Sequence, residues 1–271
     1  MLKALGWLRP SRARGPKPAV PQGLVVYAIG DVHGQADLLA ALLDPIIREA
    51  AERGHSTGLV CLGDYVDRGP ASRQVIEALI ASKAAPGLEA RFLRGNHDQS
   101  LLDFLAEPAT GPDWCEFGGR ETLASYGVTP PRVRDAPEQW EKAREDLAAA
   151  LPASHLAFLQ KSELSLELGD YFFAHAGARP GVPLSDQSDR DLMWIRQPFL
   201  GDDRRFEKVV VHGHTPAEAV HADHRRIGLD TGAYATGVLS AVRLEGEDRR
   251  LVQAKRQSGG GVQLQAAPLQ A

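Results

Sequence analysis

Five short segments of the sequence place carboxylates, imidazoles and one amide next to glycines. They are residues 30–34, 63–69, 94–98, 175–177 and 212–216. Alone, the segment at 30–34 is equally well explained as a turn with a helix cap, and a lone histidine such as His175 or His214 is more often a satisfied core or surface residue. Five in one chain favour a shared site, and this ligand set is what a two-metal phosphoester hydrolase needs. Mixed imidazole, carboxylate and amide ligands suit manganese, iron or zinc better than calcium.

The elements before these segments indicate how they are brought together. Apolar runs at 24–29, 59–62 and 88–93 each end near a glycine and predict buried strands. Residues 37–53 and 71–82 have the apolar spacing of helices. Alternating strands and helices predict a parallel sheet, in which sites form beyond the carboxyl ends of the strands. Asp64 lies at such an end, where its two carboxylate oxygens can bridge two metal ions.

The second half of the chain predicts a different arrangement. Residues 98–162 predict an all-helical insertion, with a turn at 114–119. Strands are expected at 164–168, 171–174, 209–211, 226–229 and 237–244. These strands predict a second sheet packed face to face against the first. The expected fold is therefore α/β, a two-sheet β-sandwich flanked by helices.

Composition limits the classes of function. The chain has 271 residues and a net charge of −4, which gives no basic field for nucleic acid. Two cysteines, Cys61 and Cys115, form no disulfide framework, and low cysteine usage fits the cytoplasm. No apolar run approaches the ~20 residues that span a bilayer. We expect a monomer.

The two ends of the chain differ from its middle. Residues 1–22 are basic and rich in proline, and we expect a disordered leader rather than an interfacial anchor. Residues 253–271, with their Ser-Gly-Gly-Gly run, read as a disordered tail. A single domain is then expected over 23–252.

The segments at 30–34, 63–69, 94–97 and 212–216 resemble a family signature in residue type, order and spacing. The family is that of the calcineurin-like metallo-phosphoesterases. Within it, the resemblance is to the phosphoprotein phosphatase branch, and in particular to its small bacterial and phage serine/threonine phosphatases. It covers residues 24–245, about the whole of the expected domain.

This resemblance implies roles for individual residues. One metal would be held by Asp31, His33 and Asp64, and the second by Asp64, Asn96, His175 and His214. His97 would be the general acid and Asp67 would orient it, while Arg68 and Arg196 would bind phosphate oxygens alongside Asn96. His212 stands where relatives often carry an apolar residue and is not expected to be a ligand. Asp230 is expected to pin a loop or a histidine rather than to act in catalysis.

Three functions compete at this point. The first is hydrolysis of phosphoserine and phosphothreonine in proteins by a hydroxide bridging two metals, with Mn²⁺ expected and iron or zinc as alternatives. The second is hydrolysis of symmetrical diadenosine tetraphosphate or a related nucleotide, and the third is a non-catalytic binding module on the same fold. Related nucleotide hydrolases tend to lack a carboxylate at the position of Asp67, which favours the first. The third would be expected to have lost a ligand, and none is missing from the sequence.

Overall fold

A computed structural model describes residues 17–54 and 56–270. Residues 1–16 of the predicted leader lie outside the described part. The remainder of the leader is not disordered, because Val20 is buried and its N–H donates to the carbonyl of Gly246 at 3.1 Å. The ordered domain thus begins several residues before the predicted boundary at residue 23.

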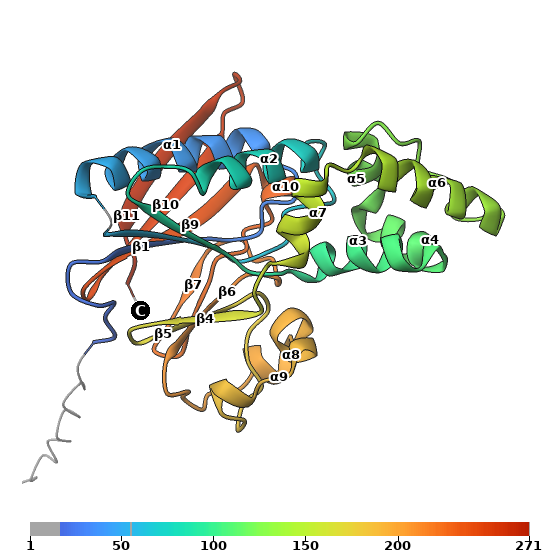
Figure 1. The fold of residues 1–271 in the computed structure, drawn as a ribbon. Helices are drawn as coiled ribbons and strands as arrows, with labels where there is room; N and C mark the ends of the chain where they lie inside the picture. The colour runs from blue at the N-terminus through green and yellow to red at the C-terminus, as the bar shows by residue number, and fades with distance from the viewer. Residues whose placement is uncertain (1–16, 55, 271) are drawn as a thin grey trace, which may run out of the picture.

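Eleven strands of the described chain form two mixed sheets (Figure 1). The first sheet has the order β11 (Val262–Pro268), β10 (Asp248–Arg256), β9 (Val238–Glu245), β1 (Val25–Ile29), β2 (Thr57–Cys61) and β3 (Leu88–Phe92). The second has the order β4 (Ser165–Leu168), β5 (Tyr171–Ala174), β6 (Val209–His212), β8 (Arg226–Gly228) and β7 (His221–Ala222). Strands β1, β2 and β3 are parallel, as are β5, β6 and β8.

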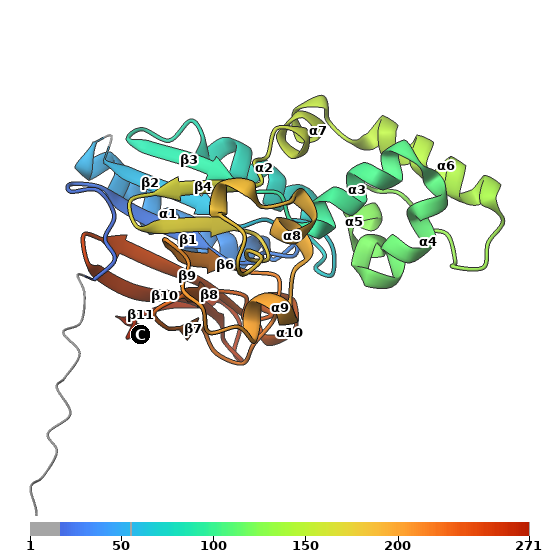
Figure 2. The same ribbon diagram turned by 90° about the horizontal axis from the view of Figure 1, so that it is seen from below.

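Helices cover the outer faces of both sheets, so the molecule has four layers (Figures 1 and 2). Helices α1 (Ala36–Arg53) and α2 (Ser72–Ser82) bury leucines such as Leu42 and Leu79 against the first sheet. Between the sheets, Val60 of β2 packs in one cluster with Phe173 of β5 and Val211 of β6. Helices α8 (Asp189–Trp194) and α9 (Gln197–Leu200) close the far side of the second sheet. The predicted sandwich fold is confirmed.

Between β3 and β4 the chain is helical and projects from the sandwich (Figure 1). Its elements are α3 (Asn96–Ala106), a 3₁₀ turn (Pro108–Thr110), α4 (Gly111–Trp114), a π-helical turn (Cys115–Gly119), α5 (Arg120–Ser125), α6 (Pro137–Ala150) and α7 (Ala153–Gln160). The turn predicted at 114–119 is wrong. The segment stays helical and only Gly118 leaves helical geometry, with φ at 115°. The remaining short helices are a 3₁₀ turn (Leu184–Asp186) and α10 (Ala233–Thr236). No helix of the described residues is long and apolar enough to cross a membrane.

Two expectations for the end of the chain are wrong. Strand β9 belongs to the first sheet, because it pairs antiparallel with β1, with Val25 opposite Glu245. Residues beyond 253 are not a disordered tail, because β10 runs to Arg256 and pairs with β11, with Ala254 opposite Leu264. The glycine-rich run that resembles a linker is the hairpin between these two strands.

We expect the substitution Ala254→Asp to destabilise the protein by about 3 kcal/mol or more. Ala254 is fully buried in the core that contains α1, and a carboxylate there has no partner. Urea unfolding followed by circular dichroism measures the difference. The matched control is Ala266→Asp on exposed β11, which should change stability by less than about 0.5 kcal/mol. Equal stabilities of the two variants would contradict the pairing of β10.

Candidate dimetal active site

The predicted ligands meet where strands of the two sheets end. In the first sheet, His33 follows β1, Asp64 follows β2 and Asn96 opens α3 just after β3. In the second, His175 directly follows β5 and His214 lies two residues beyond β6. All five are buried. The strand ends thus position the side chains as the sequence predicts.

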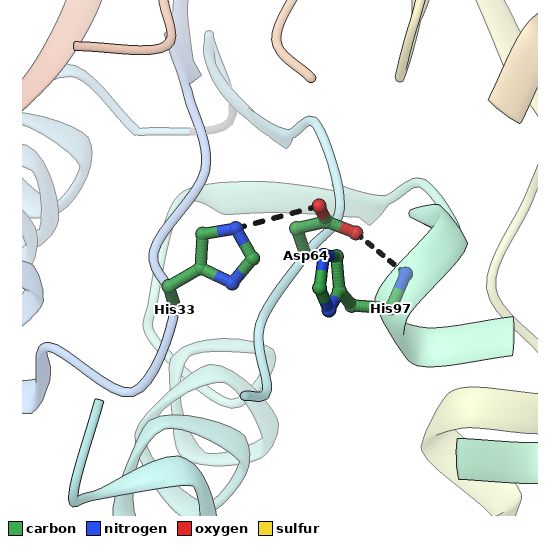
Figure 3. A group of neighbouring side chains, drawn as sticks. All are labelled: His33, Asp64 and His97. Carbon is green, nitrogen blue, oxygen red and sulfur yellow. Dashed lines mark hydrogen bonds and ion pairs between the residues drawn. The ribbon is translucent and has the colours of Figure 1, made fainter. Parts of the chain in front are cut away.

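Two groups of potential metal ligands share one carboxylate. His33, Asp64 and His97 form the first group and Asp64, His175 and His214 the second, with the ligand atoms of each group within 4.8 Å of one another. Figure 3 shows Asp64 between His33 and His97. Its Oδ2 lies 3.5 Å from His33 Nε2, and its Oδ1 accepts the backbone N–H of His97 at 2.9 Å.

The protonation of the imidazoles fits a cation at this carboxylate. His33 Nδ1 donates to the carbonyl of Val66 at 2.8 Å, and His175 Nδ1 donates to that of Leu62 at 2.9 Å. Burial lowers the pKa of His33 to about 3 and also lowers the pKa of His175, so both rings are neutral. Their Nε2 lone pairs therefore face Asp64 Oδ2 at 3.5 and 3.4 Å, an arrangement of acceptors that a divalent ion satisfies.

A further pair of buried carboxyl groups lies at the site. Asp31 accepts the backbone N–H of His214 at 3.0 Å and has the carboxyl of Asp230 as a neighbour. Burial and the neighbouring carboxylates of Asp230 and Asp64 raise the pKa of Asp31, which again calls for positive charge nearby. Asp230 accepts the N–H of Gly232 at 2.8 Å, the loop-pinning role expected for it, but its other neighbour is Asp31 and not a histidine.

His97 lies in the first group, but other residues engage both of its ring nitrogens. Nδ1 donates to Asp67 Oδ2 at 2.8 Å, and Nε2 accepts from the Arg68 guanidinium at 3.0 Å. Although burial opposes it, the carboxylates of Asp64 and Asp67 raise the pKa of His97. A buried imidazole that a carboxylate keeps basic suits proton transfer better than metal ligation.

The helical insertion holds Asp67 in place, a contribution that the sequence analysis missed. The Trp114 indole donates to Asp67 Oδ2 at 2.8 Å, and the Thr122 hydroxyl donates to Oδ1 at 2.7 Å. The π-helical turn also meets Arg68, whose N–H donates to the carbonyl of Gly118 at 3.1 Å. The residues in these contacts with Asp67 are about fifty positions apart in the chain, and no local pattern in the sequence indicates such contacts.

The two arginines lie on different sides of the ligand groups. Arg68 contacts His97, whereas Arg196 Nε donates to His214 Nε2 at 3.1 Å. His212 takes no part in either group. Its Nε2 accepts from Arg226 at 3.1 Å, and its ring packs edge-on against Phe199.

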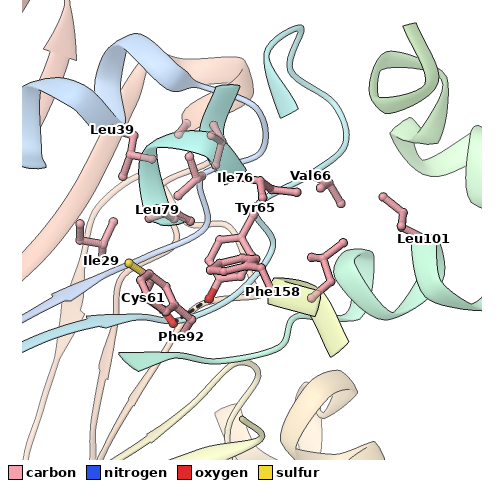
Figure 4. Packing of buried hydrophobic residues seen from close by; sticks show 14 of the residues in the cluster. Ile29, Leu39, Cys61, Tyr65, Val66, Ile76, Leu79, Phe92, Leu101 and Phe158 are labelled. Atoms are coloured by element: carbon pink, nitrogen blue, oxygen red, sulfur yellow. Dashed lines mark hydrogen bonds between the residues drawn. The ribbon is translucent and has the colours of Figure 1, made fainter. Parts of the chain in front are cut away.

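Asp98 is a third residue to which the sequence analysis assigned no role. Its buried carboxylate accepts three backbone N–H groups, those of Asp64 at 2.8 Å, Gly95 at 2.9 Å and Tyr65 at 3.0 Å. Tyr65 is fully buried among Phe92 and Phe158 and fixes the same turn from the core side (Figure 4). Asp98 thus ties the turn that carries Asp64 to the turn that carries Asn96. Its place at the end of segment 94–98 was the available signal.

Two of the glycines that leave no room for a side chain lie directly against carboxylates of the site. A Cβ on Gly95 would lie 2.0 Å from Asp64 Oδ1, and one on Gly213 would lie 1.9 Å from Asp31 Oδ1. Any side chain at either position would displace a carboxylate of the site.

Residues 24–243 match the family described as calcineurin-like phosphoesterase. This chain is a calcineurin-like phosphoesterase. The family depends on two metal ions, and the ligand groups centred on Asp64 fit that requirement. The protein is therefore a metal-binding hydrolase of phosphoesters, and the family resemblance seen in the sequence is confirmed.

Two curated relatives and one solved structure illustrate the similarity. The chain is 26% identical to the asymmetrical bis(5'-nucleosyl)-tetraphosphatase PrpE of Anoxybacillus flavithermus, over 81% of this chain and 90% of that protein. It is 29% identical to the symmetrical bis(5'-nucleosyl)-tetraphosphatase of Janthinobacterium sp., over 86% of this chain and 96% of that one. A crystal structure provisionally assigned as a diadenosine tetraphosphatase matches with a TM-score of 0.58 at 21% identity, over 93% and 98% of the two chains.

For this calcineurin-like phosphoesterase we expect Asp98→Asn to weaken metal binding. The amide would turn an N–H toward one of the backbone N–H groups that Asp98 now accepts, and the Asp64 turn would shift. The dissociation constant for Mn²⁺ should rise about 10–100-fold, as measured by calorimetric titration of metal-stripped protein. Asp103→Asn, on the exposed side of the same helix, is the control and should leave this constant unchanged. An unchanged Mn²⁺ affinity in Asp98→Asn would refute the positioning role of Asp98.

Proposed function

We propose that this phosphoesterase hydrolyses dinucleoside polyphosphates, with diadenosine tetraphosphate as the representative substrate. The names of the two curated relatives support this substrate class. The third expectation, a non-catalytic module, has no support, because every ligand position and both arginines are retained.

One structural observation carries the proposal. A basic cavity of about 790 Å³ continues from Arg196 along α8, away from the ligand groups. Arg179 and Arg190 line it together with Arg196, against the single acid Asp191, which pairs with Arg179 at 2.7 Å. A phosphate monoester needs no cationic surface beyond its own phosphoryl group, whereas a polyphosphate chain does.

The family resemblance supplies the proposed metal ligands. Asp31, His33 and Asp64 would hold one ion. Asp64 would also bind the second ion, together with Asn96, His175 and His214. When bound, the two ions supply an activated water and neutralise phosphate charge. Mn²⁺ remains the proposed metal, with iron or zinc as alternatives, because the ligand set is of mixed hardness.

The remaining polar residues orient the substrate and move a proton. Arg68 and Arg196, with the amide of Asn96, bind the phosphoryl oxygens from two sides. When Arg68 turns to the phosphate it would release His97 Nε2, which would then take a proton from solvent and give it to the leaving oxygen. Asp67 holds the opposite ring nitrogen and stabilises the charged imidazole.

A second candidate substrate is phosphoserine or phosphothreonine in proteins. The buried His97–Asp67 pair favours it, because an alkoxide leaving group needs a strong proton donor and a nucleotide leaving group does not. The pair therefore stands as the observation in favour of protein phosphatase activity.

His97→Asn tests the acid separately from the metal groups. We expect kcat on a phosphothreonine peptide to fall about 10²–10⁴-fold, because the alkoxide then leaves unprotonated. The loss with p-nitrophenyl phosphate should be much smaller, because nitrophenolate needs no proton. Metal content by elemental analysis should stay unchanged. Equal losses on both substrates would show that His97 acts as a ligand or as a structural residue.

A direct comparison decides between the two substrates. With Mn²⁺ at one pH, we expect kcat/KM for diadenosine tetraphosphate to exceed that for a phosphothreonine peptide at least about tenfold, or ~1.4 kcal/mol. The reverse order would establish the protein phosphatase reading.

Arg190→Ala provides the accompanying control for the basic cavity. It should raise KM for the dinucleotide several-fold and leave KM for the phosphothreonine peptide unchanged, because only the polyphosphate chain extends to Arg190. Arg250→Ala, on strand β10, should alter neither reaction.

A further inference from the structure

Exposed aromatic side chains gather at the active centre. Across residues 17–54 and 56–270, the aromatic rings among the exposed large hydrophobic side chains are Phe117, Trp194 and Tyr234. Phe117 is 64% exposed and Trp194 is 47% exposed, and both line one cavity beside the ligand groups. The ring of Tyr234 lies 4.7 Å from the Arg68 guanidinium. Exposed apolar surface that is clustered in this way marks a binding site. Binding of a phosphate group alone does not require apolar side chains there.

The cavity runs outward from the ligand groups along helix α3. It has a volume of about 400 Å³ and is lined by residues of the insertion and by Trp194 of α8. Asn96, Ser100 and Asp103 line it, and their spacing puts them on one face of the helix. At 1.5 Å per residue, this face extends ~10 Å from the metal-ligand position. The cavity thus has room for a group attached to a phosphate that is bound at the site.

Charge changes sign along this cavity. At the inner end lie Arg68, His97 and Arg196, which suit a phosphoryl group. At the outer end lie Asp103 and Asp113, both exposed. Carboxylates repel further phosphates and accept N–H groups, so the outer end suits an uncharged group with hydrogen-bond donors.

We propose that this cavity binds the nucleobase of a nucleoside phosphate, stacked on Trp194 and Phe117. The inference rests on the proposed function for the choice of a nucleotide, and it adds where the base lies. Planar bases stack on aromatic side chains with little dependence on which base it is, and the outer carboxylates can accept a hydrogen bond from an exocyclic amine of the base. The remaining phosphates then leave in the other direction, over Arg196 into the basic cavity, which shares Trp194 with this one. Trp194 therefore stands between the base and the polyphosphate.

Equilibrium binding tests the base site without relying on turnover. The probes are adenosine 5'-(α,β-methylene)diphosphate and methylenediphosphonate, which share a phosphonate chain and differ in the nucleoside. With the Mn²⁺-loaded full chain, calorimetry should show the nucleoside compound binding at least about tenfold more tightly. Trp194→Ala and Phe117→Ala should each reduce this preference at least about threefold. The affinity for methylenediphosphonate should stay within about twofold.

Matched variants separate stacking from other effects. Trp194→Phe keeps a ring and should retain the preference, while the quenching of tryptophan fluorescence by the nucleoside compound should decrease to the part that comes from the buried Trp114. Val133→Ala removes a different exposed apolar side chain and should change nothing. Equal affinities for the two probes, or a preference that survives both alanine variants, would overturn the base site. So would a loss in Trp194→Ala that is confined to a phosphothreonine peptide, because the cavity would then serve a peptide.

These outcomes are distinct from failure of the proposed function. A base preference that depends on Trp194, without hydrolysis of diadenosine tetraphosphate, would keep the base site and reject the substrate. Hydrolysis of the dinucleotide without that base preference would keep the proposed substrate and reject the base site.

Discussion

The arrangement of the whole site depends on one buried carboxylate. Asp64 belongs to both ligand groups, and neutral imidazoles from the two different sheets point lone pairs at the same oxygen. Removing the sheet-to-sheet packing would separate His33 from His175, and the shared oxygen would then lose one of its partners. The core between the sheets is therefore also what sets the spacing of the two groups.

The backbone around this carboxylate is unusual. Five non-glycine residues in the described part of the chain have positive φ, and they are His33, Asp64, Asp67, Arg68 and His214. Each such conformation costs of order 1–3 kcal/mol and persists only where surrounding contacts over-determine it. Asp98 and the buried Tyr65 supply those contacts for the Asp64 turn, and the insertion supplies them for Asp67. The strained conformations lie where the side chains converge, and the surrounding contacts hold these side chains in their directions.

The sequence predicted the parts of this structure that local patterns encode. Apolar runs ending at a glycine gave β1 and β2, and the segments after them gave Asp31, His33 and Asp64 within the site. It failed where the signal is non-local. Strand β10 has one polar face and precedes a glycine-rich hairpin, so it looks like the start of a linker until its partner β11 is known.

The same reason explains the residues that were missed. Trp114 and Thr122 reach Asp67 from a separate helical segment, and only the fold shows that this segment returns to the ligand groups. The substrate class is harder to predict from the sequence than the fold. Asp67 favours an alkoxide leaving group, whereas the basic cavity at Arg190 favours a polyphosphate. The cavity is formed by side chains whose grouping no spacing reveals.

The pairing of β1 with β9 has a consequence for how the protein is made. Asp64, His33 and His97 all emerge from the ribosome early, together with strands β1, β2 and β3 and the helices that cover them. One edge of β1 nevertheless stays unpaired until β9 emerges, because Val25 must meet Glu245. At about 5–20 residues per second this leaves an open sheet edge for roughly 10–40 s. Such an edge is a template for pairing with other chains, so the nascent protein is expected to depend on chaperone protection during that interval.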